Sequence, residues 1–276
     1  MKKQWITAAL LVACAAHANN IFLDDYTVTG GVNGDINAEI GVSRQLTGAT
    51  STYTYRNDGV TGDTASIVDD FANGGTLLTA ATYTSGTGHR ISLDTDFGSQ
   101  LAGTTWTNNF WVYSPVVAGT LTGGWYGFGV SSSGTSADAP FGEFGLIVRP
   151  DGNVTFFNGG AAAGGDAADF NPFSSIINYR MVIDEAAQTA TVSYDAFDGA
   201  LTLLGSQTLA TVGGLNFSDP DTRTLDYRVW ADDAVDATIY TYLENNSIDT
   251  IPEPATLGIF ALFGAGMMWV RKRFKS

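Results

Sequence analysis

Residues 179–195 read YRMVIDEAAQTATVSYD, and this stretch decides the fold class of the chain. Apolar and polar residues alternate with a period of two in both of its arms, Tyr179–Asp184 and Thr189–Asp195. Successive side chains of a strand point to opposite faces, so this period predicts two strands with one buried face each. The four residues between the arms are few enough to join antiparallel neighbours. The stretch therefore predicts a β-hairpin.

Segments of the same kind surround this hairpin. Residues 104–113 place Trp106, Phe110 and Val112 on one strand face and Thr105, Thr107, Asn109, Trp111 and Tyr113 on the other. Residues 146–157 predict a second hairpin, which turns at Pro150-Asp151-Gly152 with the glycine in the left-handed conformation. Tyr227–Trp230 and Ala237–Leu243 predict the last two strands. Because no stretch shows a sustained period of 3.6, we expect an all-β chain of two packed antiparallel sheets.

The beginning of the chain is typical of a secretory signal peptide. Lys2 and Lys3 precede an apolar stretch, and Ala16-His17-Ala18 is a small-residue cleavage motif. We expect cleavage between Ala18 and Asn19, which would remove residues 1–18. The alternative is a lipobox at residues 11–14, in which Cys14 would become a lipidated N-terminus. Both alternatives predict export.

The last 26 residues combine three features in a fixed order. Pro252-Glu253-Pro254 cannot continue a strand, because proline has no backbone N–H. Residues 255–270 carry no charge, and as a helix they would reach about 24 Å, against a hydrocarbon core of about 30 Å. Four cations follow and favour a cytoplasmic end, namely Arg271, Lys272, Arg273 and Lys275. The tail therefore predicts a short transmembrane helix, with the rest of the protein on the far side of the membrane.

This order of motif, apolar span and basic end resembles the PEP-CTERM sorting signal of Gram-negative bacteria, with Pro252, Glu253 and Pro254 as the motif. The resemblance covers residues 251–276. It implies an exosortase-type processing protease as partner, export through the inner membrane, and only transient membrane contact through the helix. The final location would be the cell surface or the extracellular matrix of an exopolysaccharide-producing, biofilm-forming bacterium. An uncut tail would instead make the protein a permanently membrane-anchored surface domain.

Residues 19–250 are the expected mature body, and their composition restricts its partners. A body of 232 residues suits one large β domain. It contains seven arginines, no lysine and 27 acidic residues, which gives a net charge of −20. Nucleic acid and anionic lipid are poor partners for such a surface. The only cysteine, Cys14, lies outside the body, so no disulfide stabilises it.

The order of three segments in the body resembles a concanavalin A-like, laminin-G-type jelly roll. They are the glycine-rich aromatic stretch WYGFGV at 125–130, the turn-containing stretch FGLIVRPDG at 144–152, and the hairpin at 179–195. The resemblance spans about residues 22–246 and implies a β-sandwich. It leaves the function open, since lectins, adhesion modules and hydrolases share this fold.

Few residues of the body suggest catalysis. Glycoside hydrolysis needs two carboxylates, and Asp94 and Asp96 would point the same way from one strand. The alternative for this pair is a strand that ends in a polar turn at Phe97-Gly98. His89 is the only histidine of the body, in a predicted loop and without a nucleophile motif. We expect no enzyme, with a glycan-active enzyme as the alternative.

Calcium is the metal that this composition allows, because hard cations take carboxylate and carbonyl oxygens. The candidate clusters are Asp24/Asp25, Asp69/Asp70, Asp219/Asp221 and Asp232/Asp233/Asp236, and solvated turns are the favoured interpretation of each. No cofactor is predicted from these residues. The resemblance to jelly rolls, which often hold a structural calcium, leaves one such site open without placing it.

Asn109, Trp111 and Tyr113 share one predicted strand face, and this is the arrangement that a glycan-binding surface needs. The alternative is that these aromatic residues belong to the core of the sandwich. We therefore expect an exported, non-enzymatic protein of the cell surface or matrix, which binds exopolysaccharide.

Overall fold

A computed structural model of the protein describes residues 19–24, 52–57, 64–70, 74–82, 89–113, 124–131, 142–170, 175–217, 219, 223–231 and 238–251. The predicted signal peptide, Cys14 and the tail beyond Ile251 lie outside these residues. Within the described ranges no helix is long and apolar enough to cross a membrane.

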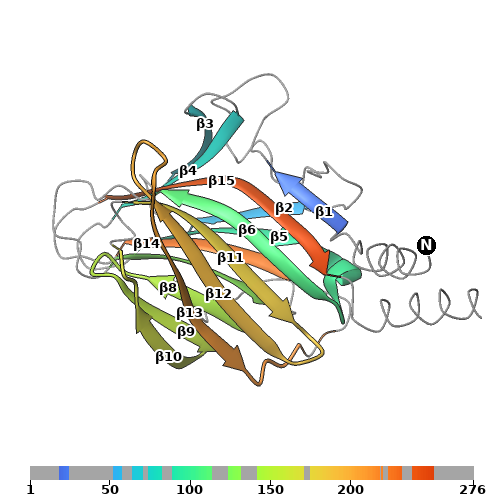
Figure 1. Cartoon of the computed structure of the whole chain (residues 1–276). Helices are drawn as coiled ribbons and strands as arrows, with labels where there is room; N and C mark the ends of the chain where they lie inside the picture. Colours follow the sequence, from blue (N-terminus) through green and yellow to red (C-terminus); the bar gives the residue numbers. More distant parts are fainter. Residues whose placement is uncertain are drawn as a thin grey trace, which may run out of the picture.

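The described strands form two antiparallel sheets that pack face to face (Figure 1). Sheet A has eight described strands, in the order β13-β12-β11-β6-β15-β4-β3, with β1 also paired to β15. Its strands are β1 (Asn19–Asp24), β3 (Thr64–Asp70), β4 (Gly74–Thr82), β6 (Thr105–Tyr113), β11 (Ile176–Asp184), β12 (Thr189–Phe197), β13 (Leu203–Gly213) and β15 (Thr238–Ile251).

Sheet B has seven described strands, in the order β10-β9-β8-β7-β14-β5-β2. Its strands are β2 (Thr52–Asn57), β5 (His89–Asp96), β7 (Trp125–Ser131), β8 (Phe144–Val148), β9 (Asn153–Asn158), β10 (Ala161–Ala167) and β14 (Thr224–Ala231). One 3-10 turn, η2 (Gly98–Leu101), follows β5 and leads into β6. The two-sheet, all-β architecture confirms the fold class that the alternating pattern predicted.

Both predicted hairpins are present. β11 and β12 pair with Tyr179 opposite Tyr194, and β8 and β9 pair with Val148 opposite Val154. Gly152 has the predicted left-handed conformation, with φ of +84°. Such a φ is strained for residues with a Cβ, so the glycine explains why the chain turns at this point.

Two predictions about strand ends were wrong. β15 continues to Ile251 and does not end at Leu243. The register of β15 shifts between Glu244 and Ser247, and the next buried residue there is the polar Asn246, so the apolar alternation is interrupted. Asn246 is nevertheless buried, and its Oδ1 accepts a hydrogen bond of 2.6 Å from Nδ2 of Asn108 on β6. His89 is the first residue of β5, opposite Ala231 of β14, and does not lie in a loop.

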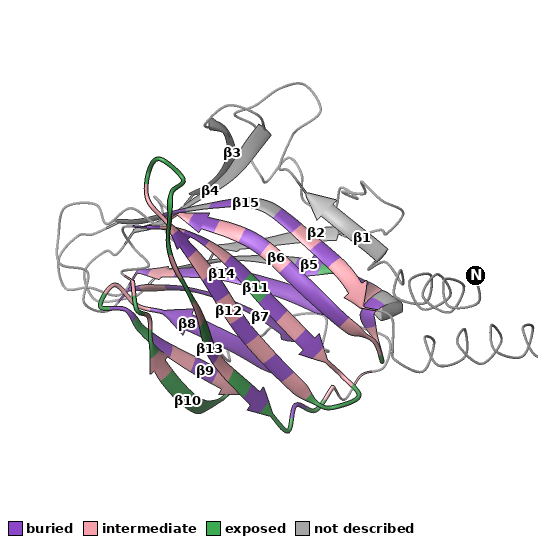
Figure 2. Cartoon of the chain, viewed as in Figure 1, coloured by how far each residue is buried: buried purple, intermediate pink, exposed green. Residues whose placement is uncertain are grey.

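The core lies between the two sheets and is rich in aromatic residues. Buried and half-buried residues alternate along β11 and β12 (Figure 2). Phe110 of β6 meets Phe128 of β7 edge to face, with ring centroids 4.4 Å apart. Tyr179 stacks near Phe110 at 5.6 Å, and Tyr194 lies 5.9 Å from Tyr179. The first contact joins the two sheets and the other two lie within sheet A, and aromatic contacts of this kind contribute beyond the burial of apolar area alone.

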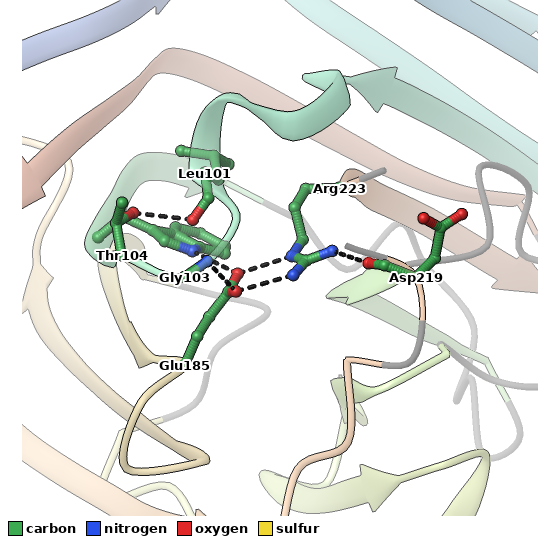
Figure 3. Close-up of polar contacts among 7 residues, drawn as sticks. Leu101, Gly103, Thr104, Glu185, Asp219 and Arg223 are labelled. Atoms are coloured by element: carbon green, nitrogen blue, oxygen red, sulfur yellow. Dashed lines mark hydrogen bonds and ion pairs between the residues drawn. The ribbon is translucent and has the colours of Figure 1, made fainter. Parts of the chain in front are cut away.

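A buried ion pair joins three connections at one end of the sandwich (Figure 3). The Arg223 guanidinium, just before β14, donates from Nε and Nη2 to the two carboxylate oxygens of Glu185, at 2.7 and 2.8 Å. Glu185 lies in the turn between β11 and β12, and it also accepts from the Gly103 N–H at 2.6 Å. Arg223 donates further to the backbone carbonyl of Asp219. Since this cluster is buried and its polar groups are mutually paired, we assign it a structural role.

Candidate binding site on the outer face of sheet A

The outer face of sheet A presents aligned polar side chains, because antiparallel register places residues of neighbouring strands in rows. The central row crosses β15, β6, β11, β12 and β13 and consists of Ser247, Asn109, Arg180, Ser193 and Thr208. Sequence positions as far apart as 109 and 247 thus become neighbours on one surface.

This surface contains a hollow of about 700 Å³, which we call the outer-face hollow. Residues of all five strands of the central row line it. They include Thr107 and Asn109 of β6, Asn178 and Arg180 of β11, Ser193 and Asp195 of β12, Ser206 and Thr208 of β13, and Asp249 of β15.

Two buried oxygens of this lining have no hydrogen-bond partner in the described protein. They are Oγ1 of Thr107, whose side chain is only 3 % exposed, and Oδ1 of Asn178. Buried polar atoms in folded proteins are nearly always hydrogen-bonded, since an unsatisfied one costs about 1–3 kcal/mol. Both atoms lie beneath the lining of the outer-face hollow, so they add two unpaired acceptors to this part of sheet A.

Arg180 lies at the centre of the hollow. Within the described part of the chain its guanidinium forms neither a hydrogen bond nor an ion pair. By contrast, Arg223 pairs with Glu185 and Arg228 pairs with Asp226. Arg180 can therefore direct its five N–H donors toward a bound molecule.

Aromatic and aliphatic residues border the hollow at one end. The Trp111 and Phe197 rings lie 5.1 Å apart and 36° from parallel. Trp111 belongs to the row beside the central row, and the row after that consists of Tyr113, Ile176, Phe197 and Leu203. Leu203 is 55 % exposed. The outer-face hollow thus combines polar groups with an adjoining apolar border.

The structure places the predicted glycan-binding residues together on this face. Asn109 lines the hollow, while Trp111 and Tyr113 lie toward its apolar end, each half-buried on the outward side of β6. They do not belong to the buried core that the alternative predicted. Their role in binding stays a prediction.

Asp94 and Asp96 lie on the other sheet and do not reach the outer-face hollow. β5 ends at Asp96, whose Oδ1 accepts a 2.8 Å hydrogen bond from the Gly98 N–H at the start of η2. This is the polar turn that we gave as the alternative for the pair. Asp94 is opposite Asp226 of β14, and the Asp226 carboxylate forms a buried ion pair with Arg228.

The calcium prediction stays open. Within the described ranges, no group of three or more His, Cys, Asp or Glu side chains is placed to hold a metal ion. Of the candidate clusters, Asp25, Asp221, Asp232, Asp233 and Asp236 lie outside the described residues.

Sequence reasoning missed most residues of the hollow. Arg180 and Asp195 occupy outward positions of the hairpin 179–195, so the alternation contained a signal for them. Asp249 had no such signal, because the prediction ended that strand at Leu243. Only the pairing of β15 with β6 brings Asp249 opposite Thr107.

This chain is similar to known proteins in its fold and not in its sequence. The sequence matches no protein-family model and no curated protein. Lectin UEA-II, solved in complex with galactose, superposes with a TM-score of 0.53 at 10 % identity, over 86 % of this chain and 100 % of the lectin. Lectin II from Ulex europaeus gives 0.52 at 9 % identity, with the same coverage. A GH131 β-glucanase catalytic domain from Podospora anserina gives 0.42 at 14 % identity, over 65 % of this chain and 73 % of that domain.

At these identities the likeness to the two lectins shows the fold alone. A shared fold does not decide between binding and catalysis, because unrelated functions occur on one architecture. The fold of this chain is the concanavalin A-like β-sandwich that lectins also have.

Proposed function

We propose that this protein is an exported, non-enzymatic protein of the bacterial cell surface or extracellular matrix, which binds polysaccharide in the outer-face hollow. The observation that carries the proposal is the polar lining of the hollow around Arg180, beside a half-buried aromatic border at Trp111 and Phe197. Sugar rings combine hydroxyl groups with apolar C–H faces, so they match a surface with both properties. The lectin complex with galactose supports this by analogy of fold only.

The bounds of the folded body support the proposed processing. β1 begins at Asn19, the first residue after the expected signal-peptide cleavage, and β15 ends at Ile251, just before the Pro252-Glu253-Pro254 motif. The two ends pair, with Asn19 opposite Thr250. Removal of residues 1–18 would leave β1 intact, and removal of the tail from Ile251 onward would take only the last residue of β15. This agrees with a mature domain of residues 19–250 and a PEP-CTERM sorting signal at 251–276, processed by an exosortase-type protease.

The carboxylates of the hollow argue for binding rather than hydrolysis there. Asp195 lies on β12 and Asp249 on β15, with β11 and β6 between them. Three strand spacings amount to about 14 Å. Glycosidases hold their two carboxyl groups within about 9.5 Å of each other. These two aspartates are thus too far apart to act as a catalytic pair.

Affinity electrophoresis of the exported protein tests the proposal, with gels that contain neutral or acidic polysaccharides, each with and without calcium. We expect retardation by at least one polysaccharide. Trp111→Ala should weaken it about tenfold, which corresponds to about 1.4 kcal/mol. Trp230→Ala is the matched control, because Trp230 is also half-buried but stacks on Trp125 in sheet B, with centroids 6.1 Å apart. Absence of retardation in every gel would refute the proposed function.

A further inference from the structure

We infer that the outer-face hollow binds an uncharged glycan chain and discriminates against chains that carry uronate groups. The inference rests on the proposed function and adds the chemical class of the ligand. It comes from the charges of the lining and from the shape of the surface.

The lining mixes one cation with two anions, which are Arg180, Asp195 and Asp249. An uncharged hydroxyl both donates and accepts hydrogen bonds, so it can satisfy the guanidinium and the carboxylates alike. A uronate carboxylate only accepts, so it would satisfy Arg180 but face repulsion from the two aspartates. An ammonium group on the ligand would be attracted by the two aspartates but repelled by Arg180. The lining therefore complements neutral hydroxyl groups.

The remaining polar groups agree with this assignment. Asn109, Asn178, Ser193 and Thr208 are neutral, and their amide and hydroxyl groups both donate and accept hydrogen bonds. The expected mature body has a net charge of −20, which also repels polyanions at long range.

The shape of the hollow favours a chain over a single sugar. Its lining extends across five strands, from β15 to β13, and four strand spacings amount to about 19 Å. A surface of this width can contact several sugars in succession. The apolar border at Trp111 and Phe197 would then contact the ring faces at one end of the chain.

The inference can be tested with three polyuronates that have different backbones, alginate among them. Each is compared with a neutral polymer, which is made from it by reducing its carboxyl groups to primary alcohols. The exported protein should bind a reduced polymer at least about tenfold more tightly than its parent at low salt, and the difference should shrink as salt rises. Equal or tighter binding of the parent would overturn the inference and leave the proposed function standing. Binding to no polymer in this set or in the earlier gels would overturn both.

Two variants test whether the aspartates of the hollow cause the discrimination against uronates. The double variant Asp195→Asn, Asp249→Asn keeps oxygen acceptors but removes two negative charges, so binding of the polyuronates should increase about tenfold at low salt. Asp151→Asn is the matched charge control on the β8–β9 turn of sheet B, and it should leave the discrimination unchanged. Circular dichroism checks that each variant is folded. A double variant that is folded and still discriminates fully would contradict the inference.

Discussion

Tyr126 and Tyr179 meet in the core, with hydroxyl oxygens 2.7 Å apart. Because both phenols can ionise at alkaline pH, they make the stability of the fold depend on pH in that range. Burial raises the pKa of both phenols above the ordinary value of 10.0. A raised pKa in the folded state means that their contribution to stability is complete below the unfolded pKa of about 10 and is lost as pH rises above it.

We therefore expect the free energy of unfolding to fall above about pH 10 because these phenols must ionise on unfolding. The double variant Tyr126→Phe, Tyr179→Phe should show a shallower fall, since it removes both groups. Urea unfolding at a series of alkaline pH values, together with tyrosinate absorbance, measures this. If the free energy of unfolding of the double variant falls as steeply with pH, other groups cause the loss of stability at alkaline pH.

Arg223 allows a second prediction at the scale of single residues. Arg223→Ala would leave the Glu185 carboxylate buried without its cation, and breaking a buried pair in this way costs about 3–5 kcal/mol. Arg149→Ala is the matched control, because Arg149 is only half-buried and donates to the Thr155 hydroxyl at 2.8 Å. Urea unfolding should show a much larger loss for Arg223→Ala. A loss below about 1 kcal/mol would mean that the three connections are held by other contacts.

At the scale of elements, the turn between β12 and β13 stores backbone strain. Leu201 has a φ of +59° and is 64 % exposed, an uncommon conformation for a leucine. The Asp198 side chain holds the turn by accepting from the N–H groups of Ala200 and Thr202, at 2.9 and 2.8 Å. These hydrogen bonds offset the strain of the left-handed residue.

Asparagine tolerates the left-handed region better than leucine does, so Leu201→Asn should stabilise the protein by about 1 kcal/mol. Leu204→Asn is the control, because it makes the same change at an exposed position, 48 %, without a positive φ. Thermal unfolding compares the two variants. Equal changes in melting temperature would show that the strain at Leu201 does not limit stability.

Elements also show what could be predicted from sequence. The hairpins at 146–157 and 179–195 were predictable because their turns are short and their alternation is regular. The far half of β15 was not, since its inward position is Asn246, whose burial depends on a hydrogen bond to Asn108 from a distant strand. Alternation could place single residues such as Asn109 and Arg180 on an outward strand face, but not bring them together. Their neighbours are set by strand order and register, which local patterns do not encode.

At the scale of the whole molecule, the two ends of the folded body meet in one strand pair. β1 pairs with β15 from Asn19 opposite Thr250 to Asp24 opposite Asn246. Trimming that extends into either strand would remove ladder hydrogen bonds from sheet A. Processing that preserves the pairing of β1 with β15 must therefore cut before Asn19 and after Thr250.

The intact mass of the protein recovered from the cell surface and medium tests this. We expect a chain that starts at Asn19 and has lost the segment after the Pro252-Glu253-Pro254 motif. Replacement of these three residues by alanine is the control, and it should retain the tail, because the proposed protease would no longer recognise it. A wild-type mass that includes the tail would make the protein a membrane-anchored surface domain. A mass that includes Cys14 with added lipid would place the mature N-terminus at Cys14 and leave β1 preceded by a lipidated linker.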